Sequence, residues 1–206
     1  MPSHSPKSLP GLDKIRDQRV LAAMRKVDRS PFVPEDMQEH AYEDRALPIG
    51  FEQSISQPFI VALMSQLLEL QGTERVLEVG TGSGYQTVIL GELAKDVYSI
   101  EIIPELAGLA SSRLMELGYK NVHLRMGDGY QGWPEEAPFD GIIVTCSPDH
   151  VPQPLVDQLK EGGRLVIPVG PGRKEQMLHQ FQKVNGELIK HPVIPVSFVP
   201  MTGDLQ

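Results

Sequence analysis

The sequence is poor in several features that mark particular classes of protein. Its 206 residues include one cysteine, Cys146, which excludes an internal disulfide and is typical of a reducing compartment. No run of about 18 apolar residues occurs, so we expect no membrane span. The first residues, MPSHSPKSLPG, lack the charged-then-apolar layout of a signal sequence. These absences predict a cytoplasmic protein that has no membrane partner.

Positive charge is also scarce. The chain has 19 Lys and Arg against 27 Asp and Glu, which gives a formal net charge of −8. Surfaces that bind nucleic acid rely on Lys and Arg to neutralise phosphates, so a nucleic-acid partner is not expected. The six histidines are scattered without the spacing of metal ligands, and no metal is expected either.

Strand-like and helix-like segments alternate through most of the chain. Apolar periodicity predicts an amphipathic helix over 12–28 and a second helix over 58–70, with Pro58 in its first turn. The segments expected after these are strands at 75–80, 96–102, 121–128, 139–146 and 163–170, and helices at 85–94, 104–117 and 154–160. Such alternation predicts an α/β fold, a doubly wound and mostly parallel sheet that follows an N-terminal helical extension.

The C-terminal part has a different pattern. QMLHQFQKV and ELIKHPVIPVSFVPM flank Asn185-Gly186, the favoured two-residue turn between antiparallel strands. We therefore expect antiparallel strands at one edge of the sheet. No linker divides the chain, so 12–206 is predicted to be one domain, with helices and a loop in 12–70 and the sheet in 71–206. Residues 1–11 are predicted to be a disordered tail.

A glycine-rich loop joins the first predicted strand of the sheet to the helix that follows it. In VLEVGTGSGY, Gly80, Gly82 and Gly84 form a G-x-G-x-G pattern, whereas a dinucleotide fingerprint would have glycine in place of Tyr85. Glycines allow a sharp turn and a close approach of ligand to backbone. In open α/β sheets, ligands bind outside the carboxyl ends of the strands, which is where this loop falls.

Three acidic residues lie at successive strand ends. Glu78 precedes the loop, Glu101 ends the second strand and is placed for ribose hydroxyls, and Asp128 ends the third and is placed for an adenine amino group. Carboxylates repel phosphates, so a dinucleotide or ATP is disfavoured, while adenosine that carries an amino acid and a sulfonium is favoured. The pattern predicts a Rossmann-like S-adenosylmethionine-dependent methyltransferase. The alternative is that the glycines only form a turn and the acids are solvated.

The segment ALPIGFEQSISQPFIV, residues 46–61, indicates the kind of methyl acceptor. Its only ionisable side chain is Glu52. An amine or hydroxyl acceptor needs a base or a metal, but a carboxylate, with an ordinary pKa of about 4, is already anionic. The predicted fourth strand ends in IIVTCSP, without the Asp/Asn-Pro-Pro-aromatic tetrapeptide of amino-directed nucleic-acid methylases, and Cys146 is interpreted as a small buried residue rather than a nucleophile. A carboxylate acceptor is left by elimination.

Several motifs together resemble the protein-L-isoaspartate O-methyltransferase family. They are LPIGFEQSISQPFIV, VLEVGTGSGYQT, GDGYQGWPEEAPFDGIIVT, VPQPLVDQLKEGGRLVIPVG and FVPMTG, and they span about Val20 to Thr202. The resemblance implies methylation of the free α-carboxylate of L-isoaspartyl residues, and more weakly of D-aspartyl residues, which starts repair through a succinimide. A small-molecule carboxyl methyltransferase and a non-catalytic S-adenosylmethionine-binding protein remain as alternatives.

The resemblance also implies roles for particular residues. The active-site serine falls on Ser56, which could instead be the N-cap of the second helix. The implied contacts to S-adenosyl-L-methionine, and to its product S-adenosyl-L-homocysteine, are Gln53, Ser54, Ile55, Glu78, Gly80, Thr81, Gly82, Gly84, Glu101, Ile102, Asp128, Gly129 and Thr202. The implied contacts to isoaspartyl proteins and peptides are Ser54, Ser56, Thr145 and Val199.

Three positions depart from the family pattern. Ser54 replaces the usual Thr, Cys146-Ser147 replaces two alanines, and Ser197 stands where Arg is frequent. The first change keeps a hydroxyl, whereas the other two alter the expected wall and charge beside the substrate. We further predict that Glu52 points to solvent, away from an anionic substrate, and that the protein is a monomer.

Overall fold

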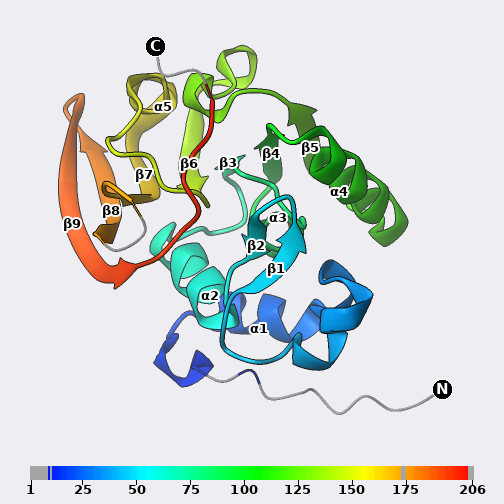
Figure 1. The fold of residues 1–206 in the computed structure, drawn as a ribbon. Helices are drawn as coiled ribbons and strands as arrows, with labels where there is room; N and C mark the ends of the chain where they lie inside the picture. The colour runs from blue at the N-terminus through cyan, green and yellow to red at the C-terminus, as the bar shows by residue number, and fades with distance from the viewer. Residues whose placement is uncertain (1–8, 10, 173–174, 204–206) are drawn as a thin grey trace.

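The computed structural model describes residue 9, residues 11–172 and residues 175–203 (Figure 1). Most of the predicted tail lies outside these residues. Its described member Leu9 is partly buried against the core, so at least this position packs on the domain. Among the residues described, no helix is both long and apolar enough to cross a bilayer.

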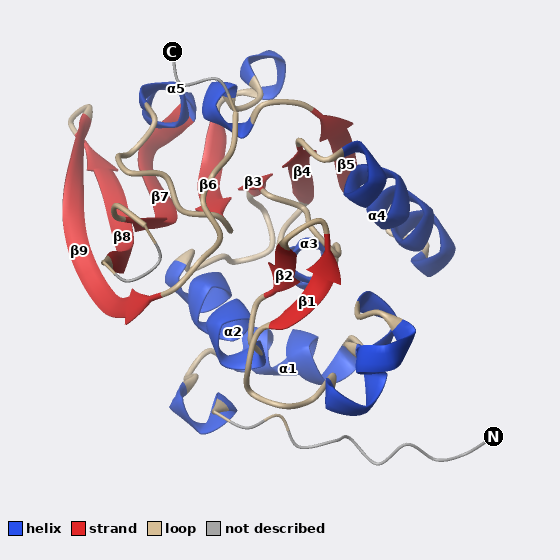
Figure 2. Cartoon of the chain, viewed as in Figure 1, coloured by secondary structure: helices blue, strands red, loops and turns tan. Residues whose placement is uncertain are grey.

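A seven-stranded sheet forms the centre of the molecule (Figure 2). Its order is β5-β4-β3-β6-β7-β8-β9, and β3 to β7 pair in parallel. The strands are β3 Arg75–Val79, β4 Asp96–Glu101, β5 Val122–Met126, β6 Phe139–Val144, β7 Leu159–Val169, β8 Gln176–Val184 and β9 Glu187–Val196. The chain adds β4 and β5 on one side of β3 and then crosses to β6 on the other side. The carboxyl end of β3 is therefore the switch point of the sheet.

The helices cover both faces of the sheet. They are α1 Gln18–Lys26, α2 Pro58–Leu67, α3 Tyr85–Leu93, α4 Pro104–Leu117 and α5 Gln153–Gln158, with short 3-10 helices η1 Leu12–Lys14, η2 Ser30–Phe32, η3 Glu35–His40, η4 Gly129–Gln131 and η5 Pro134–Glu136. Side chains alternate along each strand. Val76 and Val97 therefore belong to the core shared with α1 to α4, whereas Leu77 and Tyr98 belong to the core under α5 and η4.

The predicted C-terminal hairpin is confirmed. Asn185 and Gly186 have φ angles of 53° and 81°, as the favoured two-residue turn requires, and they connect β8 to β9. The strand β8 also pairs antiparallel with β7, which places β9 at the edge of the sheet. The order of these edge strands could not be obtained from the sequence.

Two N-terminal predictions were wrong in detail. The expected helix over 12–28 is a 3-10 turn followed by α1, because the Asp17 carboxylate accepts hydrogen bonds from the backbone N–H of Arg19 and Val20 and starts a new helix there. The predicted loop in 46–61 contains a small antiparallel hairpin of β1 Leu47–Gly50 and β2 Gln53–Ile55. Its turn residues Phe51 and Glu52 have φ angles of 52° and 57°, a conformation that their residue types do not signal.

Candidate functional site

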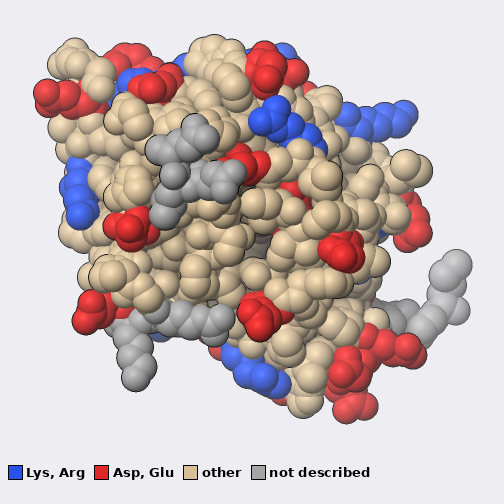
Figure 3. All heavy atoms as spheres, turned by 45° about the horizontal axis from the view of Figure 1, so that its top comes forward, with Lys and Arg blue, Asp and Glu red and all other residues tan. Residues whose placement is uncertain are grey.

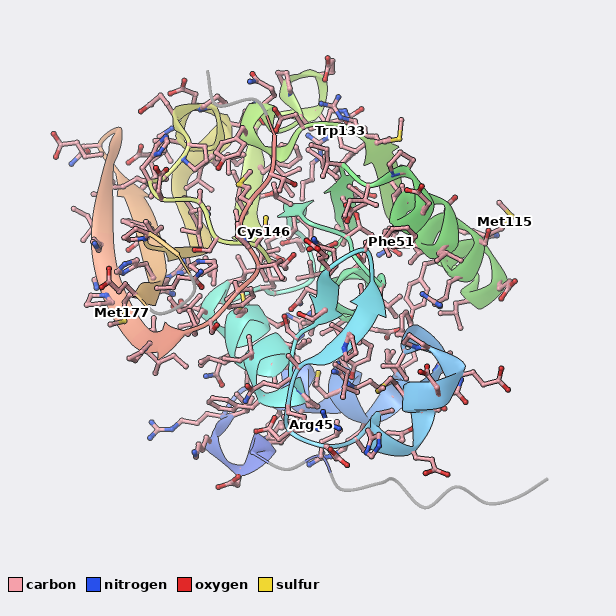
Figure 4. All side chains as sticks on the ribbon, viewed as in Figure 1. Arg45, Phe51, Met115, Trp133, Cys146 and Met177 are labelled. Atoms are coloured by element: carbon pink, nitrogen blue, oxygen red, sulfur yellow. The ribbon has the colours of Figure 1, made fainter. Side chains whose placement is uncertain are left out.

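A cavity opens at the carboxyl ends of β3, β4 and β6, at the switch point of the sheet. It encloses about 560 Å³, including its open mouth. Its lining comprises Gln53, Ser54, Val79, Gly80, Gly82, Ile100, Glu101, Ile102, Ile103, Gly127, Gly129, Thr145, Cys146, Val199, Pro200, Met201 and Thr202. We call it the cofactor cavity. Figure 4 labels Cys146 near the end of β6 and Phe51 at the tip of the β1–β2 hairpin.

The glycine loop forms the floor of this cavity. The backbone N–H groups of Gly80 and Thr81 donate to the Ile100 carbonyl at 2.9 and 3.2 Å, which ties the loop to β4. Gly80 has a φ of 95°, and a Cβ there would lie 2.5 Å from the Thr145 hydroxyl oxygen. Only glycine therefore permits this turn.

Glu101 is fixed at the edge of the cavity and is 5% exposed. Its Oε2 accepts from the Gly82 N–H at 2.7 Å, and its Oε1 accepts from the N–H groups of Ile102 and Ile103 at 2.9 and 3.0 Å. These bonds hold the carboxylate rigid, and its remaining lone pairs can accept from hydroxyl groups of a ligand.

Glu78 lies near the loop, as predicted, but it does not line the cofactor cavity. It shares the face of β3 that packs on α3, because alternate residues of a strand point to opposite faces. Its Oε2 accepts from the hydroxyls of Thr87 and Ser99 at 2.5 and 2.6 Å, and Ser99 is 2.6 Å from the Thr81 hydroxyl. Complete burial raises the pKa of Glu78 to about 8, and its Oε1 is among the buried atoms without a hydrogen-bond partner. Glu78 thus supports the loop from below.

The C-terminal segment of residues 199–202 also lines the cavity, and Figure 1 shows this part of the chain running past the end of β6. The N–H of Ser147 donates to the Val199 carbonyl at 2.8 Å, and the N–H of Met201 donates to the Ser147 carbonyl at 2.9 Å. Asp128, predicted to meet adenine, caps η4 through a 2.9 Å bond from the Tyr130 N–H and is not part of the lining. Its neighbour Gly129 does line the cavity, and a Cβ there would lie 2.3 Å from Val79 Cγ1.

A larger groove, of about 1640 Å³ when its open mouth is included, adjoins the cofactor cavity. Its lining comprises Ala46, Ser54, Ser56, Gln57, Phe59, Ile60, Thr145, Ile194, Pro195, Val196, Ser197, Phe198 and Val199. None of these described residues has an ionisable side chain. The groove and the cofactor cavity share Ser54, Thr145 and Val199, so these residues mark the place where the two spaces meet.

Ser56 lies on the groove and also on a smaller cavity beneath the hairpin, which is lined in addition by Ser54, Gly80 and Thr81. The alternative role for Ser56 as an N-cap is wrong. Gln57 occupies the N-cap position of α2 without a side-chain bond, and the N–H of Phe59 donates instead to Asp44 at 3.0 Å. The Ser56 hydroxyl is thus not used in capping.

Thr145 and Cys146, the two residues that follow β6, both support the cofactor cavity. The Thr145 hydroxyl is 3.0 Å from the Val79 carbonyl and 2.6 Å from the Gly80 carbonyl, so it braces the glycine loop. Burial, with a contribution from Glu101, raises the pKa of Cys146 to about 12, and its thiol is therefore neutral at pH 7. Cys146 is half-buried and lines the cavity with this neutral thiol.

The structure brings most of the predicted residues together. The cofactor cavity contains Gln53, Ser54, Gly80, Gly82, Glu101, Ile102, Gly129, Thr145, Val199 and Thr202. Ile55 and Thr81 line the smaller cavity, and Gly84 has a φ of 86° at the start of α3, where a Cβ would face Ala110. Glu52 is exposed and absent from these linings, as predicted.

Sequence reasoning missed the apolar part of the lining. These residues are Val79, Ile100, Ile103, Gly127, Pro200 and Met201. Val79 and Ile100 are the last or next-to-last residues of β3 and β4, and Gly127 directly follows β5. Position at a strand end was therefore the signal that could have found these three residues.

The lining fits S-adenosyl-L-methionine. Among the described residues of the cofactor cavity, Glu101 and Cys146 alone have ionisable side chains, and the thiol is neutral. The Glu101 carboxylate and the apolar walls suit an adenosine that carries a positive sulfonium. The described lining contains no Lys or Arg that could bind the phosphates of a nucleotide.

Comparisons with known proteins agree with this fit. A family profile described as protein-L-isoaspartate(D-aspartate) O-methyltransferase matches residues 9–206. The protein-L-isoaspartate O-methyltransferase of Opitutus terrae is 57% identical over 190 residues, covering 92% of this chain and 82% of that protein. The corresponding protein of Gloeobacter violaceus is 52% identical over 190 residues, covering 92% and 93%.

Solved structures give the same result. A Plasmodium falciparum structure, described as a protein-L-isoaspartate O-methyltransferase in complex with S-adenosyl-L-homocysteine, aligns with a TM-score of 0.82 and 29% identity, over 94% of this chain and 96% of that one. Another structure under the same enzyme name has a TM-score of 0.82 and 30% identity. The alignment covers 91% of this chain but 62% of that longer chain.

Proposed function

This chain belongs to the protein-L-isoaspartate(D-aspartate) O-methyltransferase family, and from that premise we propose how its two adjoining cavities carry out the reaction. It is an enzyme that transfers the methyl group of S-adenosyl-L-methionine to L-isoaspartyl residues of proteins and peptides. The cofactor cavity holds the methyl donor, and the neutral groove holds the damaged segment. The observation that carries this assignment is that the two spaces meet at Ser54, Thr145 and Val199.

The donor cavity positions its ligand mainly through fixed backbone and one carboxylate. When bound, S-adenosyl-L-methionine supplies an electrophilic methyl group. Glu101 accepts hydrogen bonds from the ribose hydroxyls, while Val79 and Ile100 form an apolar wall. Gly129 lets the backbone come close to the base, and the C-terminal segment of residues 199–202 covers the ligand. These contacts exclude water and fix the direction of the transfer.

The acceptor side needs no general base. The α-carboxylate of an isoaspartyl residue is ionised at neutral pH, because its ordinary pKa is about 4. No described residue that lines the groove has an ionisable side chain, so none of them is available as a general base. Ser54 and Ser56 donate hydrogen bonds that orient the carboxylate toward the shared edge of the two cavities. Alignment of the reacting atoms supplies the rate enhancement.

The product explains the link to repair. A methyl ester is a better acyl donor than a carboxylate, so the N–H of the following residue attacks the ester carbonyl and methanol leaves. The resulting succinimide is hydrolysed partly to a normal aspartyl linkage. D-Aspartyl residues are proposed as weaker substrates, and the donor is released as S-adenosyl-L-homocysteine.

The remaining proposals concern partners and location. Figure 3 shows Lys and Arg in separate groups on the face drawn there, with Asp and Glu groups among the uncharged residues over its middle. This pattern and the net charge of −8 support an enzyme that does not use nucleic acid. A monomer in the cytoplasm is the proposed state, with the single cysteine as the support for a reducing compartment.

Replacement of Ser56 tests the assignment of the groove. Ser56→Ala removes a hydroxyl that acts on the acceptor and not on the donor. We expect kcat/KM for an isoaspartyl peptide to fall by about tenfold or more, which equals roughly 1.4 kcal/mol, while the Kd for S-adenosyl-L-homocysteine stays unchanged. Ser111→Ala, on the exposed face of α4, is the control and should leave both values unchanged. An unaltered kcat/KM in the Ser56 variant would refute this role.

A further inference from the structure

The acceptor is an anion, yet the cavities that would receive it contain no cation. The lining residues of the groove, of the cofactor cavity and of the smaller cavity under the hairpin include no Lys, Arg or His among those described. Hydroxyl groups alone are weaker partners for a carboxylate than charged donors are. A positive charge located just behind these linings would therefore act on the acceptor.

Arg29 is such a charge. It lies between α1 and η2 and is 0% exposed, so its guanidinium is removed from water. Its Nη2 donates to the Ser56 carbonyl at 2.7 Å, and its Nε donates to the Ala41 carbonyl at 2.8 Å. The same guanidinium lies 4.9 Å from the centre of the Tyr85 ring, in the residue that follows the glycine loop. Arg29 thus connects the backbone of Ser56 to Tyr85, the first residue of α3.

The charge of Arg29 is not held in an ion pair. No acid of the described residues forms an ion pair with it, and its Nη1 is one of the buried atoms that has no hydrogen-bond partner. Burial lowers the pKa of Arg29 to about 10, with Tyr85 and Asp44 opposing this effect, so the group is still protonated at pH 7. Burying a cation without an ion-pair partner is costly, and the field of a buried charge is weakly screened.

We propose that Arg29 is a positioning residue for the methyl acceptor, which fixes the Ser56 peptide and supplies from behind it the positive charge that the site lining lacks. The inference rests on the proposed role of Ser56. Two consequences can be separated. The Nη2 bond holds the Ser56 carbonyl while the Nε bond ties the same guanidinium to the Ala41 carbonyl, and this governs how well the acceptor is aligned. The charge favours an ionised acceptor over a neutral one, and this governs selectivity.

The test compares two peptides of one sequence, one with isoaspartate and one with isoasparagine, which is its uncharged α-carboxamide. Their Kd values are measured on the full chain saturated with S-adenosyl-L-homocysteine, and kcat and KM are measured separately for the isoaspartyl peptide. The ratio of the two Kd values reports the preference for an anion. A loss of fold would abolish binding of both peptides and of S-adenosyl-L-homocysteine, but it would not change this ratio selectively.

Arg29→Gln should reduce the preference for the anion by about tenfold, as expected for the loss of one buried charge near the acceptor. Arg29→Lys keeps the charge but not the two-pronged geometry, so it should retain the ratio and lower kcat. Arg75→Gln is the matched control, because Arg75 also lies 4.9 Å from a tyrosine ring, that of Tyr98, but starts β3 at the opposite end of the strand. It should leave the ratio and kcat unchanged.

The outcomes that would overturn the inference are distinct from a failure of the proposed function. An unchanged ratio in Arg29→Gln, with S-adenosyl-L-homocysteine still bound, would refute the electrostatic role. If Arg29→Gln does not fold, Arg29→Lys decides, and a lysine variant with the kcat of the unaltered protein refutes the positioning role. An unaltered protein that does not methylate the isoaspartyl peptide refutes the proposed function instead, before any variant is compared.

Discussion

Glu78→Gln should flatten the pH dependence of folding stability between pH 6 and pH 8. Glu78 is fully buried beneath the glycine loop, and burial raises its pKa from 4.5 to about 8. The amide of Gln keeps an oxygen that can accept the hydroxyl bonds of Thr87 and Ser99. The substitution therefore removes the titration and preserves much of the local geometry.

The sign follows from the raised pKa. The folded protein keeps a proton on Glu78 over a range in which the unfolded chain has lost it, so this stabilisation is complete below about pH 4.5 and is lost as the pH rises through about 8. One pKa unit corresponds to about 1.36 kcal/mol. Proton binding by Glu78 alone then makes the folded state about 2 kcal/mol less stable at pH 8 than at pH 6.

Urea unfolding at the two pH values measures this difference. The change in the free energy of unfolding from pH 6 to pH 8 should be about 2 kcal/mol smaller in Glu78→Gln than in the unaltered protein. Burial acts to raise the pKa of Glu92, but hydrogen bonds from Lys26 and Tyr119 outweigh it and hold that pKa low, so Glu92 is ionised in both states across this window. Glu92→Gln should thus leave the pH dependence unaltered. Equal slopes for Glu78→Gln and the unaltered protein would refute the reasoning.

Two further substitutions examine the walls of the cofactor cavity. Gly129→Ala places a Cβ 2.3 Å from Val79 Cγ1 and 3.1 Å from Met201 Cε, so stability should fall by about 1–3 kcal/mol and S-adenosyl-L-homocysteine should bind more weakly in a calorimetric titration. Gly108→Ala, in α4 with no atom within 4 Å, should instead stabilise by up to about 1 kcal/mol, and equal effects of the two would contradict the packing argument. Cys146, with a pKa raised to about 12, should react with iodoacetamide at pH 8 far more slowly than free cysteine, and Cys146→Ala should keep methyl transfer of the same order, whereas rapid labelling would contradict a neutral thiol.

The parts of the fold that follow from local patterns were predictable. The glycine loop, the alternation of strands and helices, and the Asn185-Gly186 turn each have a short-range signal, and each occurs where expected. The β1–β2 hairpin does not, because Phe51 and Glu52 adopt left-handed angles only under tertiary constraint. The break before α1 was missed for a related reason. Leu12 and Ile15 continue the apolar period, and the capping carboxylate of Asp17 overrides it.

The site shows the same division. Residues at strand ends, such as Glu101 and Thr145, could be placed from their position in the chain. The orientation of Glu78 depends on which face of β3 packs against α3, which the position of Glu78 beside the loop did not reveal. Arg29 is separated from Ser56 by 27 residues and has no motif of its own, so its contact with the Ser56 carbonyl emerges only from the folded structure.

The most direct test of the central claim is methyl transfer from labelled S-adenosyl-L-methionine to two peptides of one sequence, one with isoaspartate and the other with aspartate. We expect the label to enter the isoaspartyl peptide alone, as an ester that base hydrolyses. No incorporation into either peptide, or equal incorporation into both, would contradict the assignment of the neutral groove to an isoaspartyl carboxylate.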